Sequence, residues 1–194
     1  MILKNLEKYN IILASKSPRR KQLLEELGID FKVFVIESIP EDYPIGLEKN
    51  KIPVYLAEQK ANAYLNYLKE NTLLVTADTI VWQNDKVLGK PKNREEAFEI
   101  VKQLSGNIHQ VITGVCILTN KKQTSFYSST DVHFVELTDE EIYYYIDKCK
   151  PFDKAGAYGI QELIGHIGVD RIDGSYFNVM GLPIQKLYQE LKKF

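Results

Sequence analysis

Cysteine is scarce in this chain, and long apolar runs and excess charge are absent. Only 2 of its 194 residues are cysteines, in an apolar run (Cys116) and at an expected helix end (Cys149), which favours a reducing compartment without a disulfide framework. The early charges are unlike a signal peptide, and no apolar run approaches the ~20 residues that span a membrane. A formal net charge of −1 argues against a nucleic-acid binder that relies on bulk electrostatics. We therefore expect a soluble cytoplasmic protein that binds neither membranes nor nucleic acid.

Three familiar catalytic patterns are also missing. No Gly-Lys-Ser/Thr follows the first expected strand, so there is no Walker A loop. No Gly-x-Ser-x-Gly elbow of a serine hydrolase occurs. His109, His133 and His166 lie far apart and lack the paired spacing of a zinc site.

Expected strands and helices alternate through the first half of the chain. Strands are expected at 11–13, 31–36, 73–75, 109–118 and 126–137, and helices at 17–28, 54–69, 93–106, 138–146 and from Pro183 onward. A turn is expected at Asn84-Asp85, and the last third reads as rich in loops. This order predicts an α/β fold in which a mixed sheet with flanking helices forms two lobes around a substrate cleft.

The first helix carries positive charge at an unusual end. Ser17 and Pro18 read as an N-cap and a first helical residue, which places Arg19 and Arg20 in the first turn. The helix dipole is already positive there, so these cations are unfavourable unless an anion lies between them and the free N–H groups. A strand, loop and helix of this kind suit a polyphosphate. The alternative is two exposed arginines that tolerate a small penalty.

Asp78 is the strongest candidate for catalysis. It is expected at the end of the strand 73–75, and in open α/β sheets ligands bind beyond the carboxyl ends of strands. An acid there can hold a metal ion or orient water; the alternative is a carboxylate that caps a turn. Lys60 on a helix and Lys90 on a short loop before Pro91 are candidates for substrate contact, although each alone more often lies in solvent.

A glycine-containing segment, 153–161, forms a second cluster. Its glycines allow the backbone to approach a ligand closely, and Gln161 offers both a donor and an acceptor to the edge of a base. The alternative is an ordinary bend with a surface glutamine.

Taken together, these motifs resemble those of the Maf family of nucleoside triphosphate pyrophosphatases, from about Ile11 to the C-terminus. The segments that carry the resemblance occur in one order: 13–20 (Leu-Ala-Ser-Lys-Ser-Pro-Arg-Arg), 77–79 (Ala-Asp-Thr), 89–91 (Gly-Lys-Pro), Gly114, 153–161 (Asp-Lys-Ala-Gly-Ala-Tyr-Gly-Ile-Gln), 174–176 (Gly-Ser-Tyr) and 178–183 (Asn-Val-Met-Gly-Leu-Pro).

The resemblance implies a single domain over 1–194, related in fold to inosine triphosphatase. It also implies hydrolysis of a nucleoside triphosphate to the monophosphate and pyrophosphate with a divalent metal cation, Mg²⁺ or Mn²⁺. The Tyr158–Gln161 segment looks like the branch acting on dTTP and UTP. By resemblance alone we further expect a homodimer and a role in nucleotide pool cleaning or in cell division arrest.

The resemblance also assigns roles to individual residues. Asp78 is the expected proton acceptor, and Glu41 and Asp78 are the expected metal ligands. Base specificity is expected from Arg19, Thr79 and Gln161. The expected substrate-binding set is Ser15, Ser17, Arg19, Arg20, Lys60, Thr79, Lys90 and Gln161.

Two departures from the family pattern stand out. The second acid falls in Ile39-Pro-Glu-Asp42, so Glu41 has a proline before it, and Glu37 and Asp42 are rival ligands. Gln161 is followed by Glu162, where many relatives continue with glycine.

The sequence is also compatible with two other functions. One is the same chemistry on another or a modified nucleotide. The other is a non-catalytic, nucleotide-binding regulator of septation.

Overall fold

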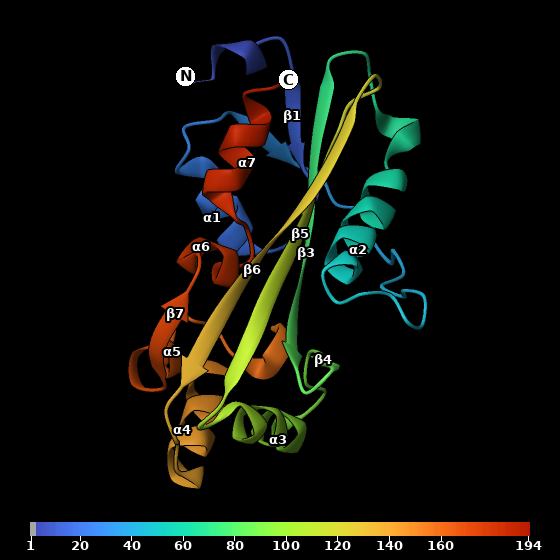
Figure 1. The fold of residues 1–194 in the computed structure, drawn as a ribbon. Helices are drawn as coiled ribbons and strands as arrows, with labels where there is room; N and C mark the ends of the chain where they lie inside the picture. The colour runs from blue at the N-terminus through green and yellow to red at the C-terminus, as the bar shows by residue number, and fades with distance from the viewer. Residues whose placement is uncertain (1–2) are drawn as a thin grey trace. The chain divides into compact units, whose positions relative to one another are not determined.

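The computed structural model describes residues 3–194. Within this range seven strands form one sheet in the order β2-β1-β3-β5-β6-β7, with β4 paired to β3 (Figure 1). The strands are β1 (Asn10–Leu13), β2 (Phe31–Val33), β3 (Thr72–Gln83), β4 (Lys86–Leu88), β5 (Ile108–Leu118), β6 (Gln123–Phe134) and β7 (Val169–Asp173). β1 is parallel to β2 and β3, whereas β4 is antiparallel to β3 and β7 to β6. The expected mixed α/β fold is confirmed.

Helices flank these strands. The α-helices are α1 (Pro18–Glu25), α2 (Lys51–Asn62), α3 (Arg94–Leu104), α4 (Asp139–Cys149), α5 (Leu163–Ile167), α6 (Tyr176–Met180) and α7 (Ile184–Leu191). Short 3₁₀ turns occur at Lys4–Leu6, Leu65–Tyr67 and Ala155–Ala157. In the described range, no helix combines the length and the apolar character needed to cross a membrane.

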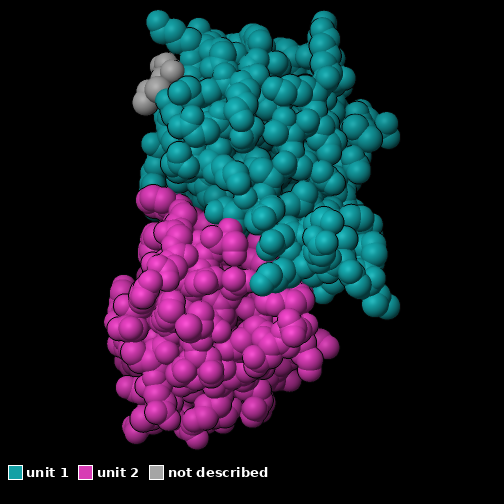
Figure 2. Space-filling view, in the orientation of Figure 1, with its two compact units in different colours: residues 1–78, 113–128, 181–194 teal, residues 79–112, 129–180 magenta. Residues whose placement is uncertain are grey.

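The chain divides into two compact units (Figure 2). Unit 1 comprises Met1–Asp78, Thr113–Ser128 and Gly181–Phe194, and unit 2 comprises Thr79–Ile112 and Ser129–Met180. The division falls within β3, β5 and β6, so each of these strands contributes to both units. Two lobes were expected from the sequence; the substrate cleft stays a prediction.

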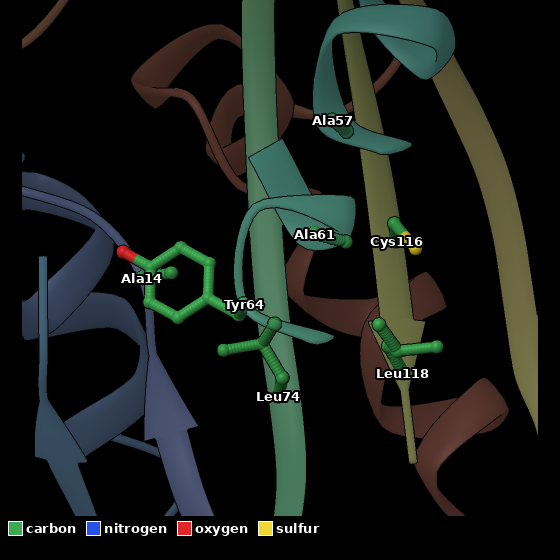
Figure 3. Packing of buried hydrophobic residues seen from close by; sticks show 7 residues of the cluster. All are labelled: Ala14, Ala57, Ala61, Tyr64, Leu74, Cys116 and Leu118. Atoms are coloured by element: carbon green, nitrogen blue, oxygen red, sulfur yellow. The ribbon is translucent and has the colours of Figure 1, made fainter. Parts of the chain in front are cut away.

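Helix α2 packs on the strands of unit 1 through small side chains. Ala57 and Ala61 of α2, with Tyr64 just beyond its end, belong to one buried cluster with Ala14, Leu74, Cys116 and Leu118 (Figure 3). At Gly114 on β5, an added Cβ would lie 2.2 Å from the backbone carbon of Pro53. The start of α2 therefore rests directly on β5, and glycine is the residue that permits this approach.

Several local predictions are confirmed. Ser17 is the N-cap of α1, with its side chain accepting from Arg20 N–H, and Pro18 is the first helical residue. Asn84 and Asp85 both have positive φ in the turn between β3 and β4, as tight hairpin turns require. Thr138 and Glu141 form a capping box at the start of α4.

Other local predictions are wrong at the boundaries. The strand expected at 73–75 is the 12-residue β3, because the β-branched residues of 76–81 continue it. The helix expected at 54–69 begins three residues earlier and ends at Asn62, followed by a separate 3₁₀ turn. The strand expected at 31–36 ends at Val33. The last third holds α5, α6 and the strand β7 where loops were expected.

Candidate functional site

The loop between β1 and α1 is held by hydrogen bonds to one of its own hydroxyl groups, that of Ser15. Ser15 is buried, and its Oγ accepts hydrogen bonds from Ser17 N–H at 3.2 Å and from Nη1 of Arg20 at 3.4 Å. Arg19 lies half-buried in the first turn of α1. The N-terminus of α1 therefore combines the positive end of the helix dipole with two arginine side chains, an arrangement that suits an anion, although Pro18 has no N–H and Arg20 N–H is already bonded to Ser17 Oγ.

Arg20 also makes hydrogen bonds to distant backbone carbonyls, which its position in the sequence did not indicate. Its Nε donates to the carbonyl of Gly181 and its Nη1 to the carbonyl of Ala77, each at 2.8 Å. Burial lowers the pKa of the Arg20 guanidinium, and the negative charge of Asp78 opposes that effect. Arg20 thus joins the start of α1 to β3 at the residue before Asp78.

Lys60, Glu41 and Asp78 form the charged centre of unit 1. Lys60 Nζ lies 2.5 Å from Oδ1 of Asp78 and 2.8 Å from Oε1 of Glu41. The side chains of Lys60 and Asp78 are only 16% and 13% exposed. Two carboxylates from distant segments therefore converge on one ammonium; the Lys60–Asp78 interaction is stronger than it would be in water, whereas the Glu41 side chain is 50% exposed.

The local structure holds Lys60 and Asp78 in place. β1 pairs with β3 only as far as Leu13 opposite Val75, so Asp78 follows the end of the parallel pairing but lies within β3. The expectation that Asp78 follows the end of its own strand is therefore wrong. Thr76 Oγ1 donates to the carbonyl of Ala57 at 2.6 Å, which fastens the helix of Lys60 to the strand of Asp78.

The loop that carries Glu41 is anchored by Tyr64. The Tyr64 hydroxyl accepts from Ile36 N–H at 2.8 Å and donates to the carbonyl of Phe34 at 3.0 Å. Burial raises the pKa of Tyr64, which keeps the hydroxyl protonated. The roles of Tyr64 and Thr76 in holding the site together were not predicted from the sequence. The only signal at Tyr64 was its place in the apolar stripe of an expected helix.

The structure separates the three rival acids of this loop. Glu37 forms an ion pair with Lys16, and Asp42 is exposed. Glu41 alone of the three shares the Lys60 ammonium with Asp78. The geometry therefore favours Glu41 as the partner of Asp78.

The Glu41 and Asp78 pair fits a hard divalent cation. Both side chains offer oxygen, and they already surround a positive charge at Lys60. Among residues 3–194 no group of three or more His, Cys, Asp or Glu side chains is arranged to hold a metal ion. Two carboxylates suit Mg²⁺, which is usually held by one or two carboxylates together with substrate phosphates.

Thr79, Lys90 and Gln161 belong to unit 2. Lys90 is exposed on its loop, and Thr79 and Gln161 are half-buried. Gly156 N–H donates to the carbonyl of Gly89 at 3.0 Å, which joins the loop of Lys90 to the segment that ends in Gln161. Oε1 of Gln161 is buried and has no hydrogen-bond partner in the described part of the chain.

Comparison with known proteins gives a consistent result. The family model described as Maf-like protein matches residues 10–194. A Parabacteroides distasonis protein named dTTP/UTP pyrophosphatase is 58% identical over 100% of both chains. A protein of the same name from Bacteroides thetaiotaomicron is 56% identical over 99% of this chain and 100% of its own.

A solved structure of a HAM1 protein from Coxiella burnetii has a TM-score of 0.50 at 12% identity, covering 96% of this chain and 100% of that one. At this identity the likeness concerns the fold alone. The family match and the near-complete coverage of both relatives agree with the motifs found in the sequence. The chain belongs to the family of Maf-like proteins.

Proposed function

We propose that this protein is a nucleoside triphosphate pyrophosphatase that hydrolyses dTTP and UTP to the monophosphate and pyrophosphate. The observation that carries the proposal is the convergence of Glu41 and Asp78 on Lys60 in unit 1, which also contains the N-terminus of α1. Relatives at 56–58% identity, aligned over 99–100% of this chain and 100% of their own length, are named dTTP/UTP pyrophosphatase, which supports the choice of substrates.

The residues of unit 1 suit the triphosphate. Ser15, Ser17, Arg19 and Arg20, at the positive end of the α1 dipole, would bind phosphate oxygens, since charge-assisted bonds and a helix N-terminus favour phosphate. Lys60 would add a positive charge, and Lys90 of unit 2 would supply a second. These groups neutralise charge that otherwise repels a nucleophile.

Asp78 would orient the attacking water toward the α-phosphorus. Carboxylates are weak bases at neutral pH, so we assign Asp78 mainly to positioning the water and holding a cation. Glu41 and Asp78 would hold Mg²⁺ or Mn²⁺, which when bound neutralises phosphate charge and lowers the pKa of water. Pyrophosphate leaves as the new bond to the α-phosphorus forms.

Thr79 and Gln161 would read the pyrimidine. Oε1 of Gln161 is a buried acceptor that makes no hydrogen bond to residues 3–194. A buried acceptor without a partner costs free energy, and a base N–H would satisfy it. Replacing Gln161 by alanine is expected to weaken discrimination among bases more than it weakens turnover.

The test is pyrophosphate release by the purified protein from dTTP, UTP, CTP, GTP and 7-methyl-GTP, with Mg²⁺, with Mn²⁺ and with neither. Metal-dependent release that favours dTTP and UTP supports the proposal. Activity on another base keeps the chemistry and removes the role of Gln161. Nucleotide binding without hydrolysis of any substrate favours the regulator of septation.

Other expectations accompany this proposal as predictions. They are a single functional domain over 1–194, a cytoplasmic location, a homodimer, no nucleic-acid partner, and a role in nucleotide pool cleaning or cell division arrest.

A further inference from the structure

The segment that ends in Gln161 closes in a tight turn. Glu162 N–H donates to the carbonyl of Gly159 at 3.0 Å, so Ile160 and Gln161 are the two central residues of a four-residue turn. On the far side, an added Cβ at Gly165 would lie 1.7 Å from the carbonyl oxygen of Ile160. Helix α5 therefore packs against the turn and limits its movement.

The side chain of Glu162 makes a second connection across this turn, in addition to the backbone hydrogen bond. Its Oε2 accepts from the Tyr145 hydroxyl at 2.9 Å, and that hydroxyl accepts from Gly159 N–H at 3.2 Å. An added Cβ at Gly159 would lie 2.8 Å from the Glu162 carboxyl carbon. The carboxylate thus folds back over the first residue of the turn that contains Gln161.

Lys154 completes the arrangement. Its Nζ lies 2.9 Å from Oε1 of Glu162 and 2.7 Å from Oδ1 of Asp153, and its side chain is only 8% exposed. Lys154 therefore offsets the negative charge of Glu162 inside unit 2, although it shares its ammonium with the more exposed Asp153. Burial, together with the negative charge of Glu162, raises the pKa of Tyr145, so its hydroxyl stays protonated and donates to the carboxylate.

We infer that Glu162, through Tyr145 and Lys154, is a positioning residue that fixes Gln161 in the orientation that reads the base. This inference rests on the proposed function and assigns no direct contact between Glu162 and the nucleotide. A side chain that is ordered before binding loses less conformational entropy when the ligand arrives. The gain is expected in substrate affinity and base preference rather than in the chemical step.

The experiment compares kinetics on UTP and CTP for the full-length protein and two variants. Glu162→Gln removes the charge and keeps the shape, and Tyr145→Phe removes the hydroxyl and keeps the ring. Each is expected to raise KM for UTP about five- to tenfold, the scale of ordering one long side chain, with kcat nearly unchanged and a smaller preference for UTP over CTP. Asp147→Asn is the matched control, because it breaks an exposed ion pair with Arg94 in the same unit, and it should change neither value.

A double-mutant comparison separates positioning from a general structural role. In a Gln161→Ala background, Glu162→Gln should have no further effect on base preference, because the side chain that it positions is gone. An equal loss in both backgrounds, or an unchanged preference in both single variants, overturns the inference. A wild-type protein that hydrolyses neither pyrimidine triphosphate overturns the proposed function as well. If Glu162→Gln does not fold, Tyr145→Phe tests the same bridge.

Discussion

The ammonium of Lys60 lies 2.5 Å from Oδ1 of Asp78 and also contacts Glu41. The positive charge thus lies between the two carboxylates proposed to hold a divalent cation. A bound cation has to share or displace that charge. Lys60 is therefore expected to reduce the repulsion between the two carboxylates when no metal ion is bound. It is also expected to compete with a metal ion for them.

Replacing Lys60 by methionine separates these roles. Without nucleotide, Lys60→Met should bind Mn²⁺ at least about tenfold more tightly, because even in water two unit charges 4 Å apart interact by about 1 kcal/mol and the ion carries two charges. Turnover should fall, since a phosphate contact is lost. Binding is followed by the electron paramagnetic resonance signal of free Mn²⁺. Lys16→Met, which breaks the exposed pair with Glu37, is the control, and weaker Mn²⁺ binding by Lys60→Met would contradict the assignment.

A second prediction concerns the three acidic residues of the loop after β2, Glu37, Glu41 and Asp42. Glu41→Gln should raise the Mg²⁺ concentration for half-maximal activity about tenfold or more, because the site loses one of two carboxylate ligands. Glu37→Gln and Asp42→Asn should leave that concentration unchanged, since neither residue shares Lys60 with Asp78. The measurement is a Mg²⁺ titration at saturating UTP. A larger effect of Asp42→Asn than of Glu41→Gln would reassign the ligand.

Gly114 predicts a stability effect independent of catalysis. Gly114→Ala places a Cβ 2.2 Å from the backbone of Pro53, where no flexible side chain can move aside. Overpacking of this severity is expected to cost about 3 kcal/mol or more of unfolding free energy. At Gly89 an added Cβ meets no atom within 4 Å, so Gly89→Ala should change stability by less than about 1 kcal/mol. Urea unfolding of both variants provides the comparison, and equal midpoints would refute the packing argument.

His109 predicts a dependence of stability on pH. Burial, with a smaller effect of His133, lowers the pKa of His109 to about 3, while an unfolded histidine titrates near ~6.5. Below pH 6.5 the unfolded chain binds a proton that the folded protein excludes, so stability falls as the pH falls. At pH 5 the His109 contribution is a loss of about 2 kcal/mol relative to neutral pH.

The test is urea unfolding from pH 7.5 to 5 for the wild type and His109→Gln. The variant loses the hydrogen bond between His109 and the Tyr158 hydroxyl and is expected to be less stable at neutral pH. Its stability should nevertheless decline less steeply below pH 6.5. Parallel curves for the two proteins would show that His109 does not titrate in this way.

Local signals in the sequence predicted much of unit 1. Ser17 and Pro18 marked the start of α1, because an N-cap followed by proline is a short-range pattern. The extent of β3 was missed, because Thr76 to Val81 combines strand-forming residues with Asp78, which reads as a turn. Strand β7 was missed for a similar reason, since charged residues separate its apolar ones and glycines flank it.

Local sequence patterns could not predict the contacts within the site, because these contacts join residues that are far apart in the sequence. Arg20 bonds to Ala77 and Gly181, which are 57 and 161 residues away. Glu41 was one of three candidate acids until the fold brought it to Lys60. The bridge from Glu162 to Tyr145 joins the residue before α5 to α4, and the sequence indicated only that Glu162 departs from the family pattern.

Hydrolysis of UTP in H₂¹⁸O, by the wild type and by Asp78→Asn, tests the central claim most directly. Mass spectrometry of the products shows which phosphorus the water attacked. We predict that ¹⁸O enters UMP and not pyrophosphate, and that Asp78→Asn folds normally but turns over about 100-fold more slowly or worse. Incorporation of ¹⁸O into pyrophosphate, or near-normal turnover by Asp78→Asn, would contradict the account.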